Sequence, residues 1–205
     1  MSAPARVVAV MAHPDDPELW AGATLAASVR AGATVTIILP RRGEPRDAEA
    51  TTSAGILGAA LTLVDDLTPA VLDPLLRDLR PEVLITHPAT DMHPEHRRVA
   101  DTVNAALPDV VIATGHPRRV YACDSYHNLD RDGRPLHLPV ILDATTTWDT
   151  KMRALSAHTS QPITEHFAPM ALNLGHLHGG RIGTAVAEAF AAVPVLGRLA
   201  PRAWL

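Results

Sequence analysis

The sequence feature that most constrains the fold is a buried-strand pattern that is followed directly by charged residues. The apolar run from Arg6 to Met11 is short and continuous, which is typical of a strand covered on both faces of a parallel sheet. The segment Ala12-His13-Pro14-Asp15-Asp16-Pro17-Glu18 follows at once and holds one histidine and three carboxylates. Open α/β sheets place their sites at the carboxyl ends of strands. Because these groups are costly to bury, the run predicts a site, and its ligand types suit a divalent metal such as zinc.

A second polar segment, Asp91-Met92-His93-Pro94-Glu95-His96, follows another apolar run, Pro81–Thr86. Pro94 suits the first position of a helix, which makes His93 the N-cap and puts His96 in the first turn. The i, i+3 spacing places both imidazoles on one face of that helix.

The two segments together supply a ligand set. His13, Asp16 and His96 offer two nitrogens and one carboxylate, and a catalytic zinc site uses three protein ligands and keeps its fourth position for water. Ferrous iron (Fe2+) can occupy the same kind of set.

At these motifs the chain resembles the PIG-L/LmbE-like zinc-dependent deacetylases. The family motif A-H-P-D-D-x-E corresponds to Ala12–Glu18, and H-P-D-H corresponds to His93–His96, with Glu95 where aspartate is usual. Weaker similarities are found at Arg46–Gly58, Lys151–Gln161 and Ala187–Phe190. The resemblance spans most of the chain and implies a Rossmann-like α/β fold that carries a metal-dependent hydrolase site.

The resemblance also implies a role for each motif residue. The residues matching His13, Asp16 and His96 bind the metal, and the residue matching Asp15 is the general base. The residue matching His93 stabilises the oxyanion or acts as general acid. Two alternatives stay open: Asp15 orients a neighbouring group only, or His93 serves only as a cap or an orienting residue.

Two further residues are candidates for substrate binding. The family arginine that matches Arg46 lies near the substrate, although Arg46 could instead pair with Glu49 at i, i+3 on one helix. Tyr126 follows a strand in a polar loop, where it either lines the pocket or belongs to the ordinary loop surface. The short connection from Gly43 to Arg46 removes part of the wall that larger family members have, which predicts an open pocket.

Other polar residues receive structural interpretations. Asp16 is expected to be the N-cap of the first helix as well as a ligand, and Glu18 is expected to interact with the helix dipole. His158 is expected to be structural. His176 and His178 lie among glycines and are interpreted as a mobile loop that could cover the pocket. Lys151 receives no functional assignment.

The apolar and polar periodicity alternates between strand and helix. The predicted strands are Arg6–Ala12, Thr34–Leu39, Leu61–Val64, Val83–Thr86, Val110–Ala113, Val120–Ala122 and Pro139–Leu142. The predicted helices are Pro17–Ala31, Asp47–Leu57, Pro69–Arg80, Pro94–Leu107, Trp148–His158 and Thr184–Ala192, followed by an irregular tail, Val193–Leu205. We therefore expect a single α/β domain over residues 1–205, with a Rossmann-like, mostly parallel sheet flanked by helices.

The composition of the chain restricts its binding partners and its cellular location. With 205 residues, 47% hydrophobic content and a net charge of −4, the chain fits a globular domain and has no basic balance that would favour nucleic acid. Cys123 is the only cysteine, which excludes an internal disulfide and fits a reducing compartment. The sequence has no apolar stretch long enough for a membrane span, so a cytoplasmic location is expected. The oligomeric state is left open, with a homo-oligomer among the options.

These observations predict a zinc-dependent hydrolase that removes an N-acyl (acetyl) group from an amino sugar or related small metabolite. The sequence has no glycine-rich phosphate loop and no G-x-S-x-G turn, so a nucleotide-binding protein and a serine hydrolase lack their motifs. The alternatives are an amidase acting on a non-sugar amide or a thiol conjugate, and a non-catalytic metal-binding protein of the same fold.

Overall fold

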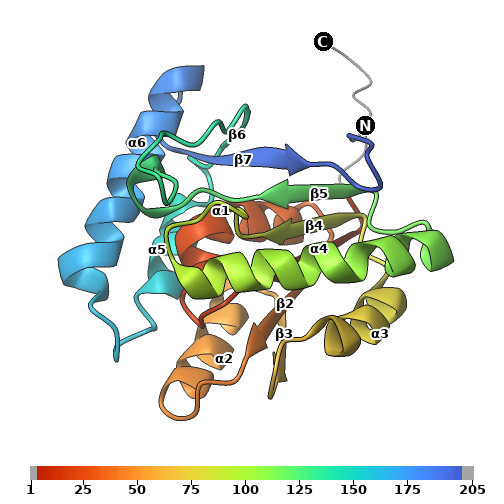
Figure 1. Ribbon diagram of the computed structural model, residues 1–205. Helices are drawn as coiled ribbons and strands as arrows, with labels where there is room; N and C mark the ends of the chain where they lie inside the picture. Colours follow the sequence, from red (N-terminus) through yellow and green to blue (C-terminus); the bar gives the residue numbers. More distant parts are fainter. Residues whose placement is uncertain (1–3, 200–205) are drawn as a thin grey trace.

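Seven strands form one sheet in the order β3-β2-β1-β4-β5-β7-β6 (Figure 1). The computed structural model describes residues 4–199. The strands are β1 Arg6–Val10, β2 Thr34–Pro40, β3 Ala60–Val64, β4 Val83–Thr86, β5 Arg119–Ala122, β6 Val140–Asp143 and β7 Ala187–Val193. Neighbours from β3 to β5 are parallel, whereas β7 is antiparallel to both β5 and β6. The predicted mostly parallel α/β sheet is confirmed.

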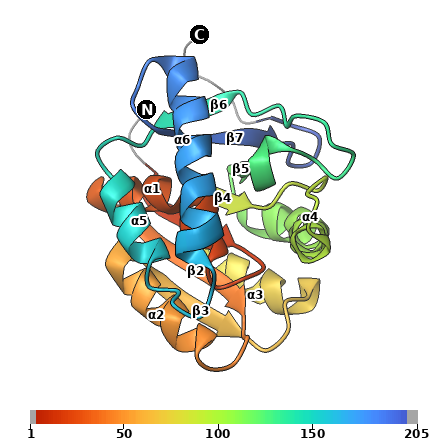
Figure 2. The same ribbon diagram turned by 90° about the vertical axis from the view of Figure 1, so that its left-hand side faces the viewer.

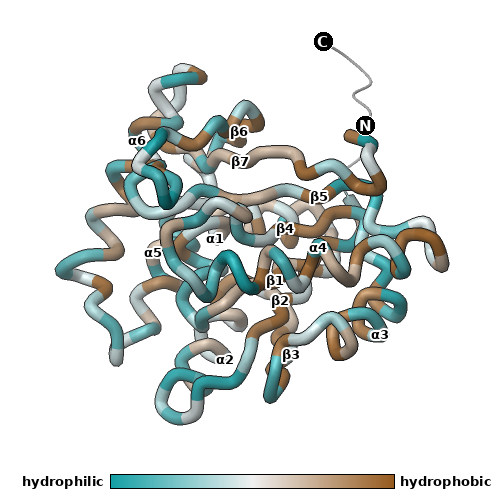
Figure 3. Tube along the Cα trace, viewed as in Figure 1, coloured by the Kyte–Doolittle hydropathy of each residue, from teal (hydrophilic) through white to brown (hydrophobic). Residues whose placement is uncertain are grey.

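Helices cover both faces of this sheet (Figure 2). They are α1 Asp16–Arg30, α2 Arg46–Leu57, α3 Pro69–Leu79, α4 Pro94–Thr114, α5 Trp148–Leu155 and α6 Ala168–Ile182, with a 3-10 turn at Tyr126–Asn128 and a π-helical turn at Ile163–Phe167. Val7 and Ala9 of β1 pack with α1, α2, α5 and α6, and Val8 and Val10 pack with α3 and α4. Burial on both faces explains why β1 has a continuous apolar sequence. Figure 3 shows the same concentration of hydrophobic residues along the central strands.

The strand order creates a crevice between β1 and β4. From β1 the chain passes to β2 and β3 on one side, and it then returns to β4 on the other side of β1. The connections that leave the carboxyl ends of β1 and β4 therefore diverge, which is where open α/β sheets bind ligands. Both polar motifs of the sequence follow these two strands.

The predicted strand Val110–Ala113 is wrong, because α4 continues to Thr114. Val110 is fully buried against α3 and the sheet, together with Val99 and Val103 of the same helix. These positions share one face of a helix, so tertiary packing extends α4 through a segment that an apolar run made look extended.

The prediction for the last third of the chain is wrong in two places. The glycine-rich segment with His176 and His178 is not a loop but part of α6. Gly175 allows this helix to pack closely, because a Cβ there would lie 2.5 Å from Trp148 Cη2. The predicted helix Thr184–Ala192 is instead strand β7, which is buried between β5 and β6. Burial in the sheet overrides the helix propensity of its alanines.

Two other expectations concern the C-terminal tail and membrane-spanning helices. The irregular tail was predicted from Val193, which ends β7, and residues 200–205 of that tail lie outside the described residues. Within residues 4–199, none of the helices combines the length and the apolar character needed to cross a membrane.

Candidate metal centre

His13 and Asp16 are brought together by the tight turn between β1 and α1. Asp16 Oδ2 accepts a hydrogen bond from the backbone N–H of His13 at 2.7 Å and lies 3.0 Å from His13 Nδ1. Asp16 is buried, and its Oδ1 accepts a hydrogen bond from Trp20 Nε1 at 3.1 Å. The expectation that Asp16 is the N-cap is wrong: Asp15 stands at that position, without a capping side-chain hydrogen bond. The Asp16 carboxylate is directed to the imidazoles instead.

His96 completes a convergent set of donor atoms. Its Nε2 lies 3.2 Å from His13 Nδ1 and 3.3 Å from Asp16 Oδ1. Donors that bind zinc at about 2.0–2.1 Å in a tetrahedron lie about 3.3 Å from one another. The three side chains predicted as ligands therefore have both the chemistry and the spacing to hold a divalent ion.

Each of the two histidines has a carboxylate behind it. His13 Nε2 lies 2.8 Å from Glu95 Oε2, which also pairs with Arg42. His96 Nδ1 lies 3.1 Å from Oδ2 of the fully buried Asp91. Carboxylates in this position fix the orientation of metal-binding imidazoles and raise their basicity. The longer Glu95, which replaces the usual aspartate of the resembled motif, still reaches its histidine.

Electrostatics in this cluster favour a cation. Burial lowers the pKa of His96, but Asp16 and Asp91 outweigh burial and raise that pKa to about 10. Burial raises the pKa of Asp16, but the neighbouring His96 and His87 hold it well below its ordinary value. The carboxylates that face His96 thus favour positive charge in this cluster, which a divalent ion would also supply.

Asp15 lies beside this cluster and has a different partner. Arg46 Nη2 donates a hydrogen bond to Asp15 Oδ1 at 2.8 Å. Burial and the charge of Asp16 raise the pKa of Asp15, and Arg46 opposes this shift. A carboxylate that accepts a proton more readily than usual has the property required of a general base.

The alternative pairing of Arg46 with Glu49 is wrong. Glu49 accepts hydrogen bonds from the backbone N–H and the hydroxyl of Ser160, both at 2.7 Å, and from Thr159 Oγ1 at 3.0 Å. Arg46 therefore pairs with Asp15, and Glu49 binds the segment that follows α5.

His93 is the N-cap of α4, as predicted. Its Nδ1 accepts the backbone N–H of Glu95 at 3.3 Å, so the ring proton of the neutral imidazole resides on Nε2. Burial, followed by the nearby His96 and His13, lowers the pKa of His93. The ring centroid lies 4.8 Å from that of His13. His93 therefore presents a neutral hydrogen-bond donor beside the candidate ligands.

A cleft of about 200 Å3 lies beside the candidate ligands. It is lined by His13, Asp15, Asp16, Leu19, Arg46, His93, Tyr126, Gln161 and Phe167. The Tyr126 ring stacks on that of His96 with a centroid separation of 5.8 Å, and burial raises the pKa of its hydroxyl. Tyr126 thus lies at the cleft rather than on the ordinary loop surface. Gln161 and Phe167 are not among the predicted site residues, although Gln161 ends the segment Lys151–Gln161 that resembles the family.

His87, at the carboxyl end of β4, was also missed. It is buried, its ring stacks on His96 at a centroid distance of 3.8 Å, and its Nε2 lies 3.2 Å from Asp16 Oδ2. The backbone N–H of Ala12 donates to the same Nε2 at 3.1 Å. Among the described residues, two sets of donors lie close enough together to hold an ion: His13, His93 and His96, and Asp16, His87 and His96. In the second set the Nε2 lone pair of His87 is already engaged by the backbone N–H of Ala12. A polar residue directly after a buried strand was the available signal.

Three further histidines singled out in the sequence, His158, His176 and His178, have other surroundings. His158 is fully buried and its Nε2 lies 3.3 Å from Glu18 Oε2, so Glu18 does more than interact with the helix dipole. His178 is buried on α6 with its Nε2 2.6 Å from Asp124 Oδ2, whereas His176 is exposed.

A mostly parallel sheet in the order 3-2-1-4-5, with polar side chains at its switch point, defines a Rossmann-like α/β fold. Solved structures share this fold over nearly the whole chain. The 4-carboxy-2-hydroxymuconate hydratase GalB from Pseudomonas putida is 20% identical, with a TM-score of 0.77 over 98% of both chains. The conserved protein TT1542 from Thermus thermophilus is 23% identical, with a TM-score of 0.78 over 92% of this chain and 94% of that chain.

An N,N'-diacetylchitobiose deacetylase from Pyrococcus horikoshii also shares the fold. It is 20% identical, with a TM-score of 0.75 over 94% of this chain and 85% of that chain. No protein-family model matches the sequence, and no curated protein sequence matches it either. At these identities the likeness establishes the fold, whereas the chemistry has to be argued from the site.

Proposed function

We propose that this chain is a zinc-dependent hydrolase that removes an N-acyl group, acetyl in the first instance, from an amino sugar or a related small metabolite. One observation carries the proposal. His13 Nδ1 and His96 Nε2 lie 3.2 Å apart, and each lies 3.0–3.3 Å from one of the two carboxylate oxygens of Asp16; a separate buried carboxylate, Asp15, lines the cleft beside them. A ligand set with an adjacent base is what hydrolysis of an unactivated amide requires.

Each step of the proposed amide hydrolysis has its own group in the site. His13, Asp16 and His96 would hold the zinc ion, which would supply Lewis acidity and thereby lower the pKa of a water molecule toward neutrality. Asp15 takes the proton of the attacking water and returns it to the leaving amine. His93 donates its Nε2–H to the acyl oxygen as negative charge develops there. The products are a free amine and a carboxylate, so one water is consumed for each amide bond broken.

Arg46 and Tyr126 would hold the substrate. Arg46 keeps Asp15 in place through their 2.8 Å hydrogen bond and lines the cleft with its guanidinium group. The N–H groups of a guanidinium suit the hydroxyls or an anionic group of a sugar-like substrate. Tyr126, together with Leu19 and Phe167, supplies an apolar wall for the acyl group.

The structural neighbours support this assignment only in part. One of them deacetylates N,N'-diacetylchitobiose, and another, Dbv21, is the A40926 pseudoaglycone deacetylase. GalB, however, is a hydratase with the same fold, so the fold does not select the reaction. Asp15 weighs against a non-catalytic metal-binding protein, because metal binding alone needs no second carboxylate beside the ligands. A non-sugar amide or a thiol conjugate remains the runner-up substrate, and ferrous iron the runner-up metal.

The test is a substrate panel scored by the free amine released from zinc-loaded protein. The panel contains N-acetylglucosamine conjugates, acyl amino acids and simple anilides, with Asp15→Asn as the matched inactive control. We expect the wild-type protein to release amine from the sugar conjugates and the Asp15→Asn variant not to do so. Release from only the other amides would refute the sugar assignment and keep the amidase. No release from any substrate, with one equivalent of zinc bound, would refute the hydrolase.

A further inference from the structure

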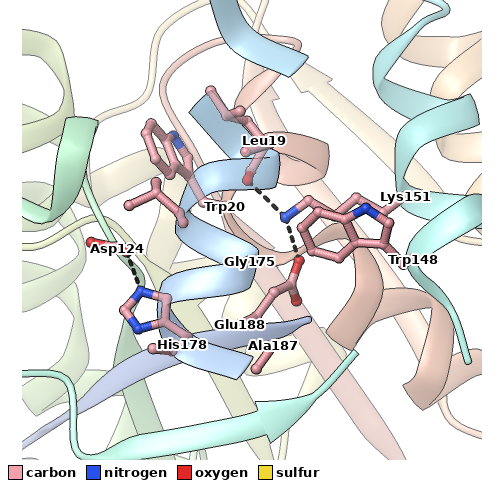
Figure 4. Close-up of a pocket in the computed structure, with 12 residues that line it drawn as sticks. Leu19, Trp20, Asp124, Trp148, Lys151, Gly175, His178, Ala187 and Glu188 are labelled. Atoms are coloured by element: carbon pink, nitrogen blue, oxygen red, sulfur yellow. Dashed lines mark hydrogen bonds and ion pairs between the residues drawn. The ribbon is translucent and has the colours of Figure 1, made fainter. Parts of the chain in front are cut away.

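A buried ion pair joins Lys151 and Glu188 beside α1 (Figure 4). Lys151 on α5 and Glu188 on β7 meet with Nζ and Oε1 2.7 Å apart, and each side chain is 3% exposed. Lys151 is the only lysine in the chain. Gly22 of α1 permits its close approach, since a Cβ there would lie 3.1 Å from Lys151 Cγ. Apolar replacements of a buried ion pair are often neutral or stabilising, so stability alone is a weak reason for this one.

Both members of the pair bind the backbone of α1. Lys151 Nζ donates to the carbonyl oxygen of Leu19 at 3.0 Å. Glu188 accepts from the N–H of Ala23 at 3.0 Å and from the N–H of Thr24 at 2.8 Å. In a regular α-helix the N–H of Ala23 bonds to the carbonyl of Leu19. The ion pair therefore engages both ends of one rung of the helix ladder, and side chains inserted at such a rung bend a helix.

This turn of α1 is directly connected to the metal centre. Trp20, which lies within it, donates its Nε1–H to Asp16 Oδ1 at 3.1 Å. The Trp20 ring also meets Tyr126 edge-on, with centroids 5.2 Å apart, and Leu19 lines the cleft. The course of α1 at this turn thus sets the position of a candidate ligand and of the cleft wall.

We propose that Lys151 and Glu188 are positioning residues that hold the Leu19–Thr24 turn of α1 apart and thereby aim the Asp16 carboxylate at the metal. The inference rests on the metal site proposed above. Neither side chain touches the candidate ligands, so both act through Leu19, Trp20 and the helix backbone. The ion pair thus fixes the geometry of the metal centre through α1 instead of contributing only to packing of the core.

The test is a double variant, Lys151→Met with Glu188→Met, studied with cobalt and without substrate. Once the pair is gone, the Leu19 carbonyl and the Ala23 N–H can bond to each other, so we expect the variant to fold with a more regular α1. Cobalt affinity should fall by about 10- to 100-fold, as it does when groups that orient ligands are lost, and the visible absorption of bound cobalt should change. Glu188→Gln, which preserves volume, should change both in the same direction.

Thr147→Val is the matched control. Thr147 Oγ1 donates to the carbonyl of Ala23 at 2.9 Å, so this variant removes a buried contact to the same helix without touching the ion pair. Its melting temperature should fall while its cobalt spectrum and affinity stay those of wild type.

The outcomes are distinguishable. A folded double variant with wild-type cobalt affinity and spectrum would overturn the positioning role and leave the proposed function intact. A double variant that does not fold would contradict the closure of the helix ladder and overturn the role as well. Wild-type protein that binds no cobalt would overturn the metal site and this inference with it.

Discussion

Asp91→Asn should weaken zinc binding without disturbing the fold. Asp91 Oδ1 accepts the backbone N–H of His93 at 2.7 Å, and asparagine keeps that acceptor. Oδ2 forms an ion pair with His96 Nδ1 at 3.1 Å, and neither of these two buried atoms makes a hydrogen bond to any of the described residues. In the variant an amide NH2 would face the Nδ1–H that His96 must carry when its Nε2 binds metal. One donor would then oppose another.

The size of the effect follows from burial. Loss of a group that orients a metal-binding histidine costs about 10- to 100-fold in affinity, or about 1.4–2.7 kcal/mol. The side chains of both Asp91 and His96 are 0% exposed, so water cannot replace the lost contact and the upper end is expected. Competition titration against a chromogenic chelator measures the affinity. Asp101→Asn, at an exposed position on α4, the helix that carries His96, is the control. An Asp91 variant that binds zinc as tightly as this control would refute the reasoning.

Three further substitutions test other parts of the account. Asp15→Asn should lower turnover by about 100-fold or more at unchanged metal content, and wild-type turnover would remove Asp15 from the mechanism. His93→Asn preserves an N-cap but removes the Nε2–H, so kcat should fall by about 10²–10³ with little change in KM; an effect confined to metal content would instead make His93 an orienting residue. Burial raises the pKa of Glu49, but hydrogen bonds from Ser160 and Thr159 outweigh burial and lower it. Glu49→Gln should therefore cost about 1–2 kcal/mol of unfolding free energy at pH 7. This difference should vanish as the pH falls through the lowered pKa, because the wild-type carboxylate is then protonated; a difference that persists in acid, measured by urea denaturation, would contradict it.

The first half of the fold could be predicted from local patterns. The strands before both motifs are buried on both faces, and the helices after them begin with proline near the start, so the sequence marks each boundary. The convergence of His13, Asp16 and His96 follows from the rule that parallel strands present their carboxyl ends on one edge.

The rest depends on packing that no local pattern reports. Helix α6 contains glycines that look like loop residues, but Gly175 is there because the Trp148 ring occupies the space of a Cβ. Strand β7 is rich in alanine, which favours a helix, but its neighbours in the sheet decide its conformation. Lys151 and Glu188 meet across 37 positions of sequence, and their joint contact with α1 is visible only once β7 and α5 are in place.

The central claim is that one divalent ion binds between His13, Asp16 and His96. Crystals grown with zinc and measured on both sides of the zinc absorption edge would locate the ion by anomalous scattering. The account predicts a single peak about 2.0–2.2 Å from His13 Nδ1, an Asp16 carboxylate oxygen and His96 Nε2. A peak coordinated by His87 in place of His13, or no peak in the cleft, would contradict it.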